Sequence, residues 1–247
     1  MIDLHSHILP GVDDGARNLE DSLAIARSCV EDGIEVIAAT PHVRDDYPTG
    51  VATMEALVGE TRRLLRDEGV PLDVRKGGEI AIDWLERLST DDLRRFGLGG
   101  NPGYLLVEFP YYGWPLRLSQ WIFQLKTMGL TPVLAHPERN ADVQADPARL
   151  NHLVEAGALV QVTAAALDGR LGRAPEEAGL ELIEIGLAHL IASDAHHASL
   201  REIGMRAAAS AVGNKRLAHW LTTEVPWAIA TGGRLPERPP KRRLFGF

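Results

Sequence analysis

The stretch Met-Ile-Asp-Leu-His-Ser-His (residues 1–7), with the segments that follow it, decides the fold class. Its opening run is typical of a strand, an amphipathic pattern predicts a helix at Leu19–Asp32, and Ile-Glu-Val-Ile-Ala-Ala-Thr (residues 34–40) is typical of a second strand. Asn18 suits the N-cap of the helix, and Gly33 suits its end. A strand, a helix and a strand in this order predict a βαβ unit with parallel strands.

The same unit recurs along the rest of the chain. Strands are predicted at Met1–His5, Ile34–Thr40, Leu72–Glu79, Tyr104–Phe109, Thr131–His136, Ala158–Thr163 and Leu187–Ser193. Helices are predicted at Leu19–Asp32, Met54–Glu68, Asp83–Arg95, Leu116–Met128, Pro147–Ala156 and Pro175–Gly186, and over most of the chain from the last strand to about Ile229. Strands that alternate with helices in this way predict an α/β fold, either a closed or distorted barrel or an open doubly wound sheet.

The composition excludes several classes of protein. At 247 residues, 45% of them hydrophobic and 24% charged, the chain matches a soluble globular protein, and we expect a single domain with one sizeable core. A net charge of −8 argues against general nucleic-acid binding. Cys29 is the only cysteine, so no internal disulfide can form, and no apolar run approaches the roughly 18 residues of a membrane span. We therefore expect a cytoplasmic protein; the sequence does not predict its oligomeric state.

Side chains that can bind metal ions follow most of the predicted strands. In chain order they are His5, His7, Asp14, His42, Glu79, Glu108, His136, Asp194 and His196. Most recur after about 30 residues, the length of one βα unit, so successive strands bring an imidazole or a carboxylate to the same end of the sheet. In α/β barrels this C-terminal face carries the active site, and the placement therefore favours a barrel.

A single histidine at the end of a strand is more often an ordinary polar residue than a metal ligand. The set as a whole argues for metal binding. His5 and His7 alternate along a strand, so both rings face the same side. Glu79 and Glu108 stand within apolar segments, where an ionised carboxylate is costly to bury without a cation or hydrogen-bond donors. We therefore interpret the nine residues as metal ligands.

The donor atoms of these residues indicate which metal ions the site would bind and which substrate group the loaded site would attract. It consists of oxygen and nitrogen atoms without a thiolate, which suits Mn, Fe or Zn ions. Nine donors are more than one ion needs and suggest two or three ions, and three dications would leave the pocket net positive and selective for phosphate. Arg139 and Arg201 lie near these ligands in sequence. A guanidinium group matches phosphate oxygens, although a surface ion pair is an equally good interpretation of each arginine.

Six motifs resemble those of one known superfamily. They are Met-Ile-Asp-Leu-His-Ser-His-Ile-Leu-Pro-Gly-Val-Asp-Asp-Gly-Ala (residues 1–16), Ala-Thr-Pro-His (39–42), Gly-Gly-Glu-Ile (77–80), Leu-Leu-Val-Glu-Phe (105–109), Ala-His-Pro-Glu-Arg (135–139) and Ser-Asp-Ala-His (193–196). Together they resemble the polymerase-and-histidinol-phosphatase (PHP) superfamily and, more narrowly, the bacterial CpsB/YwqE-type protein-tyrosine phosphatases of capsule and exopolysaccharide biosynthesis. The resemblance extends from residue 1 to about residue 201, and the first and fifth motifs make it specific.

The resemblance implies a distorted barrel of seven β/α units, in a metallophosphatase domain at residues 1–233, with a trinuclear and usually manganese-dependent site. Carried over residue by residue, it assigns His5, His7, Glu79 and Asp194 to one ion, Glu79, Glu108 and His136 to a second, and Asp14, His42 and His196 to a third. It assigns Arg139 and Arg201 to the phosphate. Asp13 adjoins Asp14 and His197 adjoins His196, so two of these assignments can be displaced by one residue.

The reaction that the resemblance implies is hydrolysis of phosphotyrosine on a tyrosine kinase that regulates polysaccharide export. A water molecule activated by the ions would attack phosphorus in line, while the two arginines neutralise the equatorial oxygens. A small-molecule phosphatase of the same superfamily, acting on substrates such as histidinol phosphate, is the alternative. Nuclease activity fits less well, because the sequence has no basic groove interleaved with aromatic residues.

Other enzyme classes lack the residues that they need. A cysteine-based tyrosine phosphatase requires Cys-x₅-Arg, but the corresponding residue after Cys29 is Glu35. The chain has no nucleotide-binding P-loop and no Gly-x-Ser-x-Gly motif. Amidohydrolases also begin with His-x-His, but that family would place a lysine at Glu108 and a histidine near Gln161. A non-catalytic binding protein of the same fold is a further alternative.

The C-terminal segment and one loop lead to two further hypotheses. Residues 234–247 are rich in arginine and proline, and we interpret them as a basic tail that is either solvated or binds an acidic partner or a membrane surface near a membrane kinase. Tyr111, Tyr112 and Trp114 closely follow the fourth predicted strand. They either line a substrate pocket or pack in the core.

Overall fold

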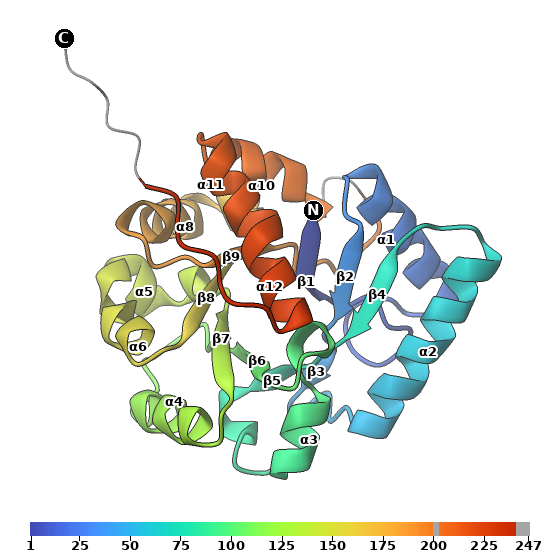
Figure 1. The fold of residues 1–247 in the computed structure, drawn as a ribbon, viewed down its shortest axis with the longest axis horizontal. Helices are drawn as coiled ribbons and strands as arrows, with labels where there is room; N and C mark the ends of the chain where they lie inside the picture. The colour runs from blue at the N-terminus through green and yellow to red at the C-terminus, as the bar shows by residue number, and fades with distance from the viewer. Residues whose placement is uncertain (200–202, 241–247) are drawn as a thin grey trace.

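The strands of the protein lie at its centre, and helices surround them (Figure 1). The structure is a computed structural model that describes residues 1–199 and 203–240. Its strands are β1 (Ile2–Ser6), β2 (Val36–Ala39), β3 (His42–Val43), β4 (Asp73–Lys76), β5 (Glu79–Ala81), β6 (Tyr104–Glu108), β7 (Thr131–Ala135), β8 (Leu159–Thr163) and β9 (Leu190–Ala192). They form two parallel sheets, with strand orders β1-β2-β4 and β3-β5-β6-β7-β8-β9.

The two sheets join into one distorted barrel. β2 continues into β3, and β4 continues into β5, each after a short interruption, so these four segments act as two strands. Between β9 and β1 the ring is closed by backbone hydrogen bonds: the N–H of Asp194 donates to the carbonyl of His5 (2.9 Å), and the N–H of His7 donates to the carbonyl of Ala195 (2.9 Å). The prediction of a single α/β domain with a barrel of parallel strands is therefore confirmed.

Helices cover the outside of the barrel. The α-helices are α1 (Leu19–Glu31), α2 (Val51–Asp67), α3 (Thr90–Arg95), α4 (Leu118–Thr127), α5 (Ala141–Ala145), α6 (Asn151–Glu155), α7 (Ala164–Leu167), α8 (Arg173–Ile185), α10 (Met205–Ala211), α11 (Lys215–His219) and α12 (Val225–Thr231). Short 3₁₀-helices occur at Ile82–Trp84, Leu98–Gly100, Pro137–Arg139 and Pro147–Leu150, and a π-helix occurs at Trp220–Glu224. The cap of α1 is as predicted, because the side-chain oxygen of Asn18 accepts the N–H of Asp21 (2.9 Å).

The structure differs from the sequence prediction where elements are short or broken. The single helix predicted at Asp83–Arg95 is wrong: a 3₁₀ turn comes first, and α3 begins only at Thr90, where the Ser89 hydroxyl accepts the N–H of Asp92 (3.1 Å). The strand predicted at Leu72–Glu79 is interrupted by two glycines between β4 and β5. Helices α5 and α7 were not predicted, because helices of about one turn show no 3.6-residue periodicity.

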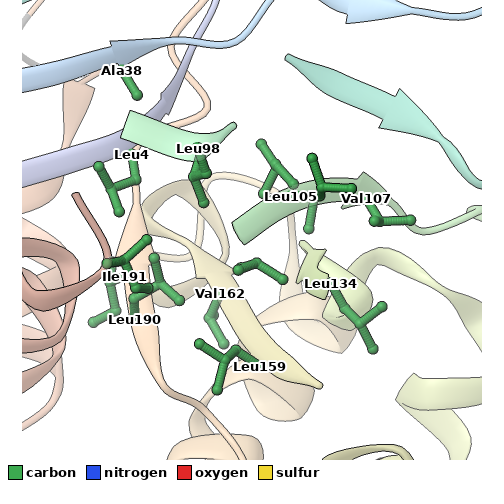
Figure 2. Close-up of a cluster of buried hydrophobic side chains, with 14 of the residues drawn as sticks. Leu4, Ala38, Leu98, Leu105, Val107, Leu134, Leu159, Val162, Leu190 and Ile191 are labelled. Carbon is green, nitrogen blue, oxygen red and sulfur yellow. The ribbon is translucent and has the colours of Figure 1, made fainter. Parts of the chain in front are cut away.

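Apolar side chains of the strands and of the helices that cover them form the core. Figure 2 shows one part of it, in which residues of β1, β2, β6, β7, β8 and β9 lie together with Leu98 of the 3₁₀-helix Leu98–Gly100. In β1, Leu4 packs in this cluster. Side chains alternate along a strand, so Asp3 and His5 lie on the opposite face, where His5 joins the other polar groups at the strand ends. The strands therefore bury apolar residues and still present polar residues at the mouth of the barrel.

Residues 234–240 run along the body of the protein. Trp220 Nε1 donates to the carbonyl of Pro236 (3.2 Å), and the guanidinium of Arg238 donates to the carbonyls of Ala188 (3.0 Å) and Ile183. Residues 241–247, the rest of the basic tail, lie outside the described residues, so the tail's docking role stays a prediction. Within the described part of the chain, no helix is long and apolar enough to cross a membrane.

Candidate metal centre

The ends of the strands bring all nine predicted ligands together. Among the described residues, four overlapping groups have ligand atoms within 4.8 Å of one another: His7, Asp14, His42 and His196; His5, Glu79 and His136; His5, His7 and Asp194; and His42, Glu79 and Glu108. Because neighbouring groups share members, the nine side chains form one cluster at the C-terminal mouth of the barrel. This is the face that carries active sites in α/β barrels.

Glu79 lies at the centre of this cluster. Its carboxylate is fully buried; Oε1 lies 2.8 Å from Nε2 of His136, and Oε2 lies 2.9 Å from Nδ1 of His42 and 3.3 Å from Nε2 of His5. The first residues of β3 and β5, His42 and Glu79, pair in register, which sets their side chains next to each other. A carboxylate with a different imidazole at each oxygen is placed to bridge two cations.

His5 and His7 leave β1 on the same side, as their alternate positions require. Their Nε2 atoms are 3.3 Å apart, and each lies 3.3 Å from Oδ1 of Asp194. Nδ1 of His5 lies 2.8 Å from Oε1 of the buried Gln161, which fixes the ring with Nε2 toward the cluster. No motif in the sequence pointed to Gln161 as a partner of His5, because the two residues meet only across the closed barrel.

Asp13 and Asp14 have different surroundings. Oδ1 of Asp14 lies 3.4 Å from Nε2 of both His42 and His196, within the cluster. The side chain of Asp13 is buried behind His7, whose Nδ1 donates to Oδ2 of Asp13 at 2.8 Å. The geometry therefore places Asp14 among the candidate ligands and Asp13 behind them, in the order that the motif resemblance assigned.

Two residues of the cluster have a left-handed backbone. His136 has φ of 36° and Asp194 has φ of 56°, and no other non-glycine residue in the described part of the chain has a positive φ. Such a conformation costs about 1–3 kcal/mol for a residue with a side chain, and it persists where the surrounding structure enforces it. Each residue comes just after a strand, β7 or β9, so the strained turn directs its side chain into the cluster.

Opposite charges in the cluster stabilise each other. Burial disfavours ionised Glu79, but the imidazoles around it, His5 first, hold the pKa of Glu79 well below its ordinary value. Burial also opposes charged His42, yet the carboxylates of Asp14 and Glu79 raise the pKa of His42 to about 9. Hydrogen bonds from His196 and His42 lower the pKa of Asp14. The site therefore keeps carboxylates ionised at neutral pH, which favours cation binding.

Two buried atoms of the cluster lack a hydrogen-bond partner: Oε2 of Glu79 and Nδ1 of His42. They lie 2.9 Å apart without the alignment of a hydrogen bond. A buried polar atom left unpaired costs roughly 1–3 kcal/mol, and cations bound in the cluster would give each of these two residues a partner. Together with a donor set of imidazoles and carboxylates, this arrangement fits divalent ions such as Mn²⁺, Fe²⁺ or Zn²⁺.

Arg139 lies at the edge of the cluster. Its Nη1 donates to Oδ2 of Asp194 at 3.0 Å, and its guanidinium stacks on the ring of Tyr111, 4.4 Å from the centroid. Arg201, the second predicted phosphate-binding residue, lies outside the described residues. His197 is exposed and belongs to none of the four groups of ligand atoms.

A pocket of about 490 Å³ opens beside Glu108. The loop between β6 and α4 supplies much of its wall, including Tyr111, Tyr112 and Trp114. Arg44 also lines the pocket, and its Nη1 donates to Oε1 of Glu108 at 2.7 Å. The sequence carries no motif for Arg44, which stands in a loop just beyond β3.

A parallel α/β barrel that gathers imidazoles and carboxylates at the C-terminal ends of its strands defines the class of barrel proteins with a metal-dependent site. Comparison with known proteins identifies the family within this class. The family model for capsular polysaccharide synthesis, CpsB/CapC, matches residues 1–226, and the chain belongs to this family.

Individual relatives agree with this assignment. The tyrosine-protein phosphatase YwqE of Bacillus subtilis (strain 168) is 37% identical, with 100% of both chains covered. The putative tyrosine-protein phosphatase CapC of Staphylococcus aureus is 32% identical over 79% of this chain and 77% of CapC. A crystal structure from work on YwqE and on CpsB of Streptococcus pneumoniae, described as unique metal-dependent tyrosine phosphatases, aligns with a TM-score of 0.86 and 36% identity, covering 97% of this chain and 98% of the other. The family that the sequence motifs resemble is therefore confirmed.

Proposed function

We propose that this chain is a metal-dependent protein-tyrosine phosphatase that works with divalent ions, Mn²⁺ first among them. The observation that carries the proposal is the cluster around Glu79, in which imidazoles and carboxylates converge at the mouth of the barrel with Arg139 at the edge. The relatives named as tyrosine-protein phosphatases, and a similar structure described as metal-dependent, support the same conclusion.

The nine donor side chains would together bind three ions. We assign the first ion to His5, His7, Glu79 and Asp194, the second to Glu79, Glu108 and His136, and the third to Asp14, His42 and His196. The position of Glu79 supports a bridging role, because Oε1 faces His136 at 2.8 Å and Oε2 faces His5 at 3.3 Å. When bound, the ions would activate a water molecule for attack on phosphorus and neutralise phosphoryl oxygens.

The side chains of the protein bind and orient the phosphoryl group. Arg139, held by Asp194 and Tyr111, presents planar N–H donors that match two phosphate oxygens. We propose the same role for Arg201 on the basis of the family resemblance. The phenolate released from phosphotyrosine has a parent pKa of about 10, so its departure needs less proton donation than the departure of a serine alkoxide.

The pocket beside Glu108 suits an aromatic substrate, because Tyr111 and Trp114 offer ring surfaces to the phenyl group of phosphotyrosine. Membership in a capsular polysaccharide family leads us to propose that the natural substrate is a tyrosine kinase that regulates capsule or exopolysaccharide synthesis. We further propose that the enzyme acts in the cytoplasm, which is consistent with a buried free thiol at Cys29.

Removal and replacement of metal test the metal dependence. Protein stripped with a chelator should lose activity toward a phosphotyrosine peptide, because the cluster would then hold no cation to activate water. Addition of Mn²⁺ should restore activity, and separate additions of Fe²⁺ and Zn²⁺ rank the alternatives. Full activity in protein shown to be metal-free by elemental analysis would contradict the proposal.

Substitutions test the cluster itself. His136→Ala and Asp194→Ala should each abolish turnover, because each removes a proposed ligand, while circular dichroism shows that the fold persists. His219→Ala is the matched control: this histidine is exposed, pairs with Glu224 at 3.7 Å, and should retain wild-type turnover when replaced.

Kinetics on three substrates test the specificity. The value of kcat/KM should be highest for a phosphotyrosine peptide, lower for the same peptide with phosphoserine, and lower for histidinol phosphate. A clear preference for histidinol phosphate would instead identify a small-molecule phosphatase.

A further inference from the structure

Arg139 contacts a carboxylate of the cluster and the ring of a tyrosine, and that tyrosine lies next to a histidine of the cluster. The carboxylate of Asp194 stands between a guanidinium and an imidazole: Oδ2 accepts from Arg139 at 3.0 Å, and Oδ1 lies 3.3 Å from Nε2 of His5. The guanidinium of Arg139 stacks on Tyr111, 4.4 Å from the ring centroid. The ring of Tyr111 in turn lies 5.9 Å from that of His136, another residue of the cluster.

Arg44 repeats this pattern on another side of the cluster. The carboxylate of Glu108 accepts from Nη1 of Arg44 through Oε1 at 2.7 Å, and its Oε2 lies 3.9 Å from Nδ1 of His42. The guanidinium of Arg44 lies 5.3 Å from the ring centroid of Tyr47. The ring of Tyr47 stacks on that of His42, with centroids 5.7 Å apart. Each arginine is therefore held by a carboxylate of the cluster and by a tyrosine that packs on a histidine of the cluster.

Arg44 is also accessible to a ligand. Its side chain is 23% exposed, close to the 27% of Arg139. Arg44 and Glu108 line the pocket of about 490 Å³, and Tyr111, on which Arg139 stacks, lines the same pocket. A substrate ring in this pocket would bring its phosphoryl group to Glu108 and so within reach of the guanidinium of Arg44.

We propose that Arg44 is a further substrate-binding residue, which donates to the phosphoryl group from the Glu108 side of the cluster as Arg139 does from the Asp194 side. A phosphoryl group has three non-bridging oxygens, and one guanidinium can pair with only two of them, so a second arginine has an acceptor to bind. The proposal rests on the phosphatase function proposed above. A residue that merely held Glu108 in place would affect metal binding but not phosphate binding once the metal is saturating.

Equilibrium binding of inorganic phosphate to the Mn²⁺-loaded protein tests this role. Isothermal titration calorimetry at saturating Mn²⁺ should show phosphate Kd about tenfold or more higher for Arg44→Gln than for the wild type, because a charge-assisted hydrogen bond is lost. Arg44→Lys keeps the charge without the planar donors and should lie between the two. It also serves as the readout if the glutamine variant does not fold. A separate Mn²⁺ titration of each variant establishes saturation.

Arg87→Gln is the matched control. Nη1 of Arg87 pairs with Oδ1 of Asp45 at 2.6 Å, and its guanidinium lies 5.2 Å from the ring centroid of Trp84, so it makes the same two kinds of contact outside the lining of the pocket. Its loss should leave phosphate Kd unchanged.

The outcomes separate this inference from the proposed function. An unchanged phosphate Kd in both Arg44 variants, with wild-type protein that binds phosphate and hydrolyses p-nitrophenyl phosphate, would overturn the role of Arg44 alone. Wild-type protein that binds no phosphate and hydrolyses no phosphoester when Mn²⁺ is saturating would overturn the proposed function, and this inference with it.

Discussion

At the residue scale, Asp13 determines how His7 is presented to the cluster. Its Oδ2 accepts from Nδ1 of His7 at 2.8 Å and from the N–H of His42 at 3.2 Å, and its Oδ1 accepts the N–H of Gly15 at 3.0 Å, so three donors hold the carboxylate in place. With Nδ1 of His7 held by Asp13, Nε2 is the atom that His7 presents to a cation, and it lies 3.3 Å from Oδ1 of Asp194. Gly15 permits the close approach, since a Cβ at this position would lie 2.1 Å from the carbonyl oxygen of His7.

We therefore expect Asp13→Asn to weaken Mn²⁺ binding by about 10–100-fold, the usual effect of removing a carboxylate that orients a metal-binding histidine. Competition with a fluorescent chelator measures the affinity. Asp21→Asn, which alters a partly exposed carboxylate paired with Arg17 outside the cluster, is the control and should bind Mn²⁺ like the wild type. Equal affinities in all three proteins would show that Asp13 does not orient His7.

His189 controls part of the pH dependence of stability. Burial, aided by the positive charge of Arg238, lowers its pKa from 6.5 to about 4, and its Nδ1 accepts the N–H of Val160 at 3.2 Å, which requires a neutral ring. At pH values between about 4 and 6.5, the imidazole of His189 is protonated in the unfolded chain but neutral in the folded chain. The free energy of unfolding should therefore fall as pH decreases from about 6.5 to about 4 and be unaffected by this residue above pH 7.

His189→Asn isolates this contribution, because the amide oxygen can accept from Val160 but does not titrate. Urea unfolding at several pH values should show wild-type stability dropping relative to the variant by about 3 kcal/mol between pH 7 and pH 4. A difference between the two proteins that does not vary with pH would contradict the prediction.

At the scale of elements, the interruption between β4 and β5 positions Glu79. β5 begins at Glu79, directly after Gly78, and Gly78 lies against the fully buried ring of Phe96. A Cβ on Gly78 would be 2.5 Å from Cδ1 of Phe96, closer than two such atoms can approach. The glycine thus lets the chain pass the core and deliver the central carboxylate of the cluster.

Gly78→Ala should destabilise the fold by about 1–3 kcal/mol, because the added methyl group overpacks the core. Gly59→Ala in α2 is the matched control, since its nearest heavy atom would be Nη1 of Arg63 at 3.8 Å. There the same change should stabilise the fold by up to about 1 kcal/mol. Urea unfolding measures both, and a Gly78→Ala protein as stable as the wild type would refute the overpacking argument.

At the scale of the whole molecule, the closed barrel concentrates ionisable groups that the unfolded chain keeps apart. Burial and the neighbouring charge of Glu79 raise the pKa of Glu108, which shows that these carboxylates repel each other. A cation bound among them relieves this repulsion only in the folded state. Metal binding should therefore stabilise the fold.

Mn²⁺ at 100 times its Kd should add about 3 kcal/mol per independent ion to the free energy of unfolding, and so raise Tm by several degrees. Calorimetry of chelator-treated and Mn²⁺-loaded protein measures the difference. Glu79→Gln should show a much smaller shift, because it removes the charge at the centre of the cluster. The same shift in both proteins would place the stabilising ions elsewhere.

The order of the main strands and helices, and the set of nine candidate ligands that the strand ends bring together, were predictable because both depend on local patterns. Apolar runs of strand length end in His42, Glu108 or His136, and each pattern can be recognised within a few residues of sequence. The assignment of donors to individual ions stays a prediction, as do the role of Arg201 and the domain boundary at residue 233.

The sequence by itself determined the α/β rhythm, the family and the kinds of atom that gather at the mouth of the barrel. Only the tertiary structure decided which atoms face one another. It placed Glu79 among four imidazoles and Asp14, rather than Asp13, in the cluster. It also brought Gln161 and Arg44 into contact with residues far from them in sequence. The physical reason is that periodicity arises from neighbours along the chain, whereas these contacts form only when the closure of β9 onto β1 brings distant strand ends together.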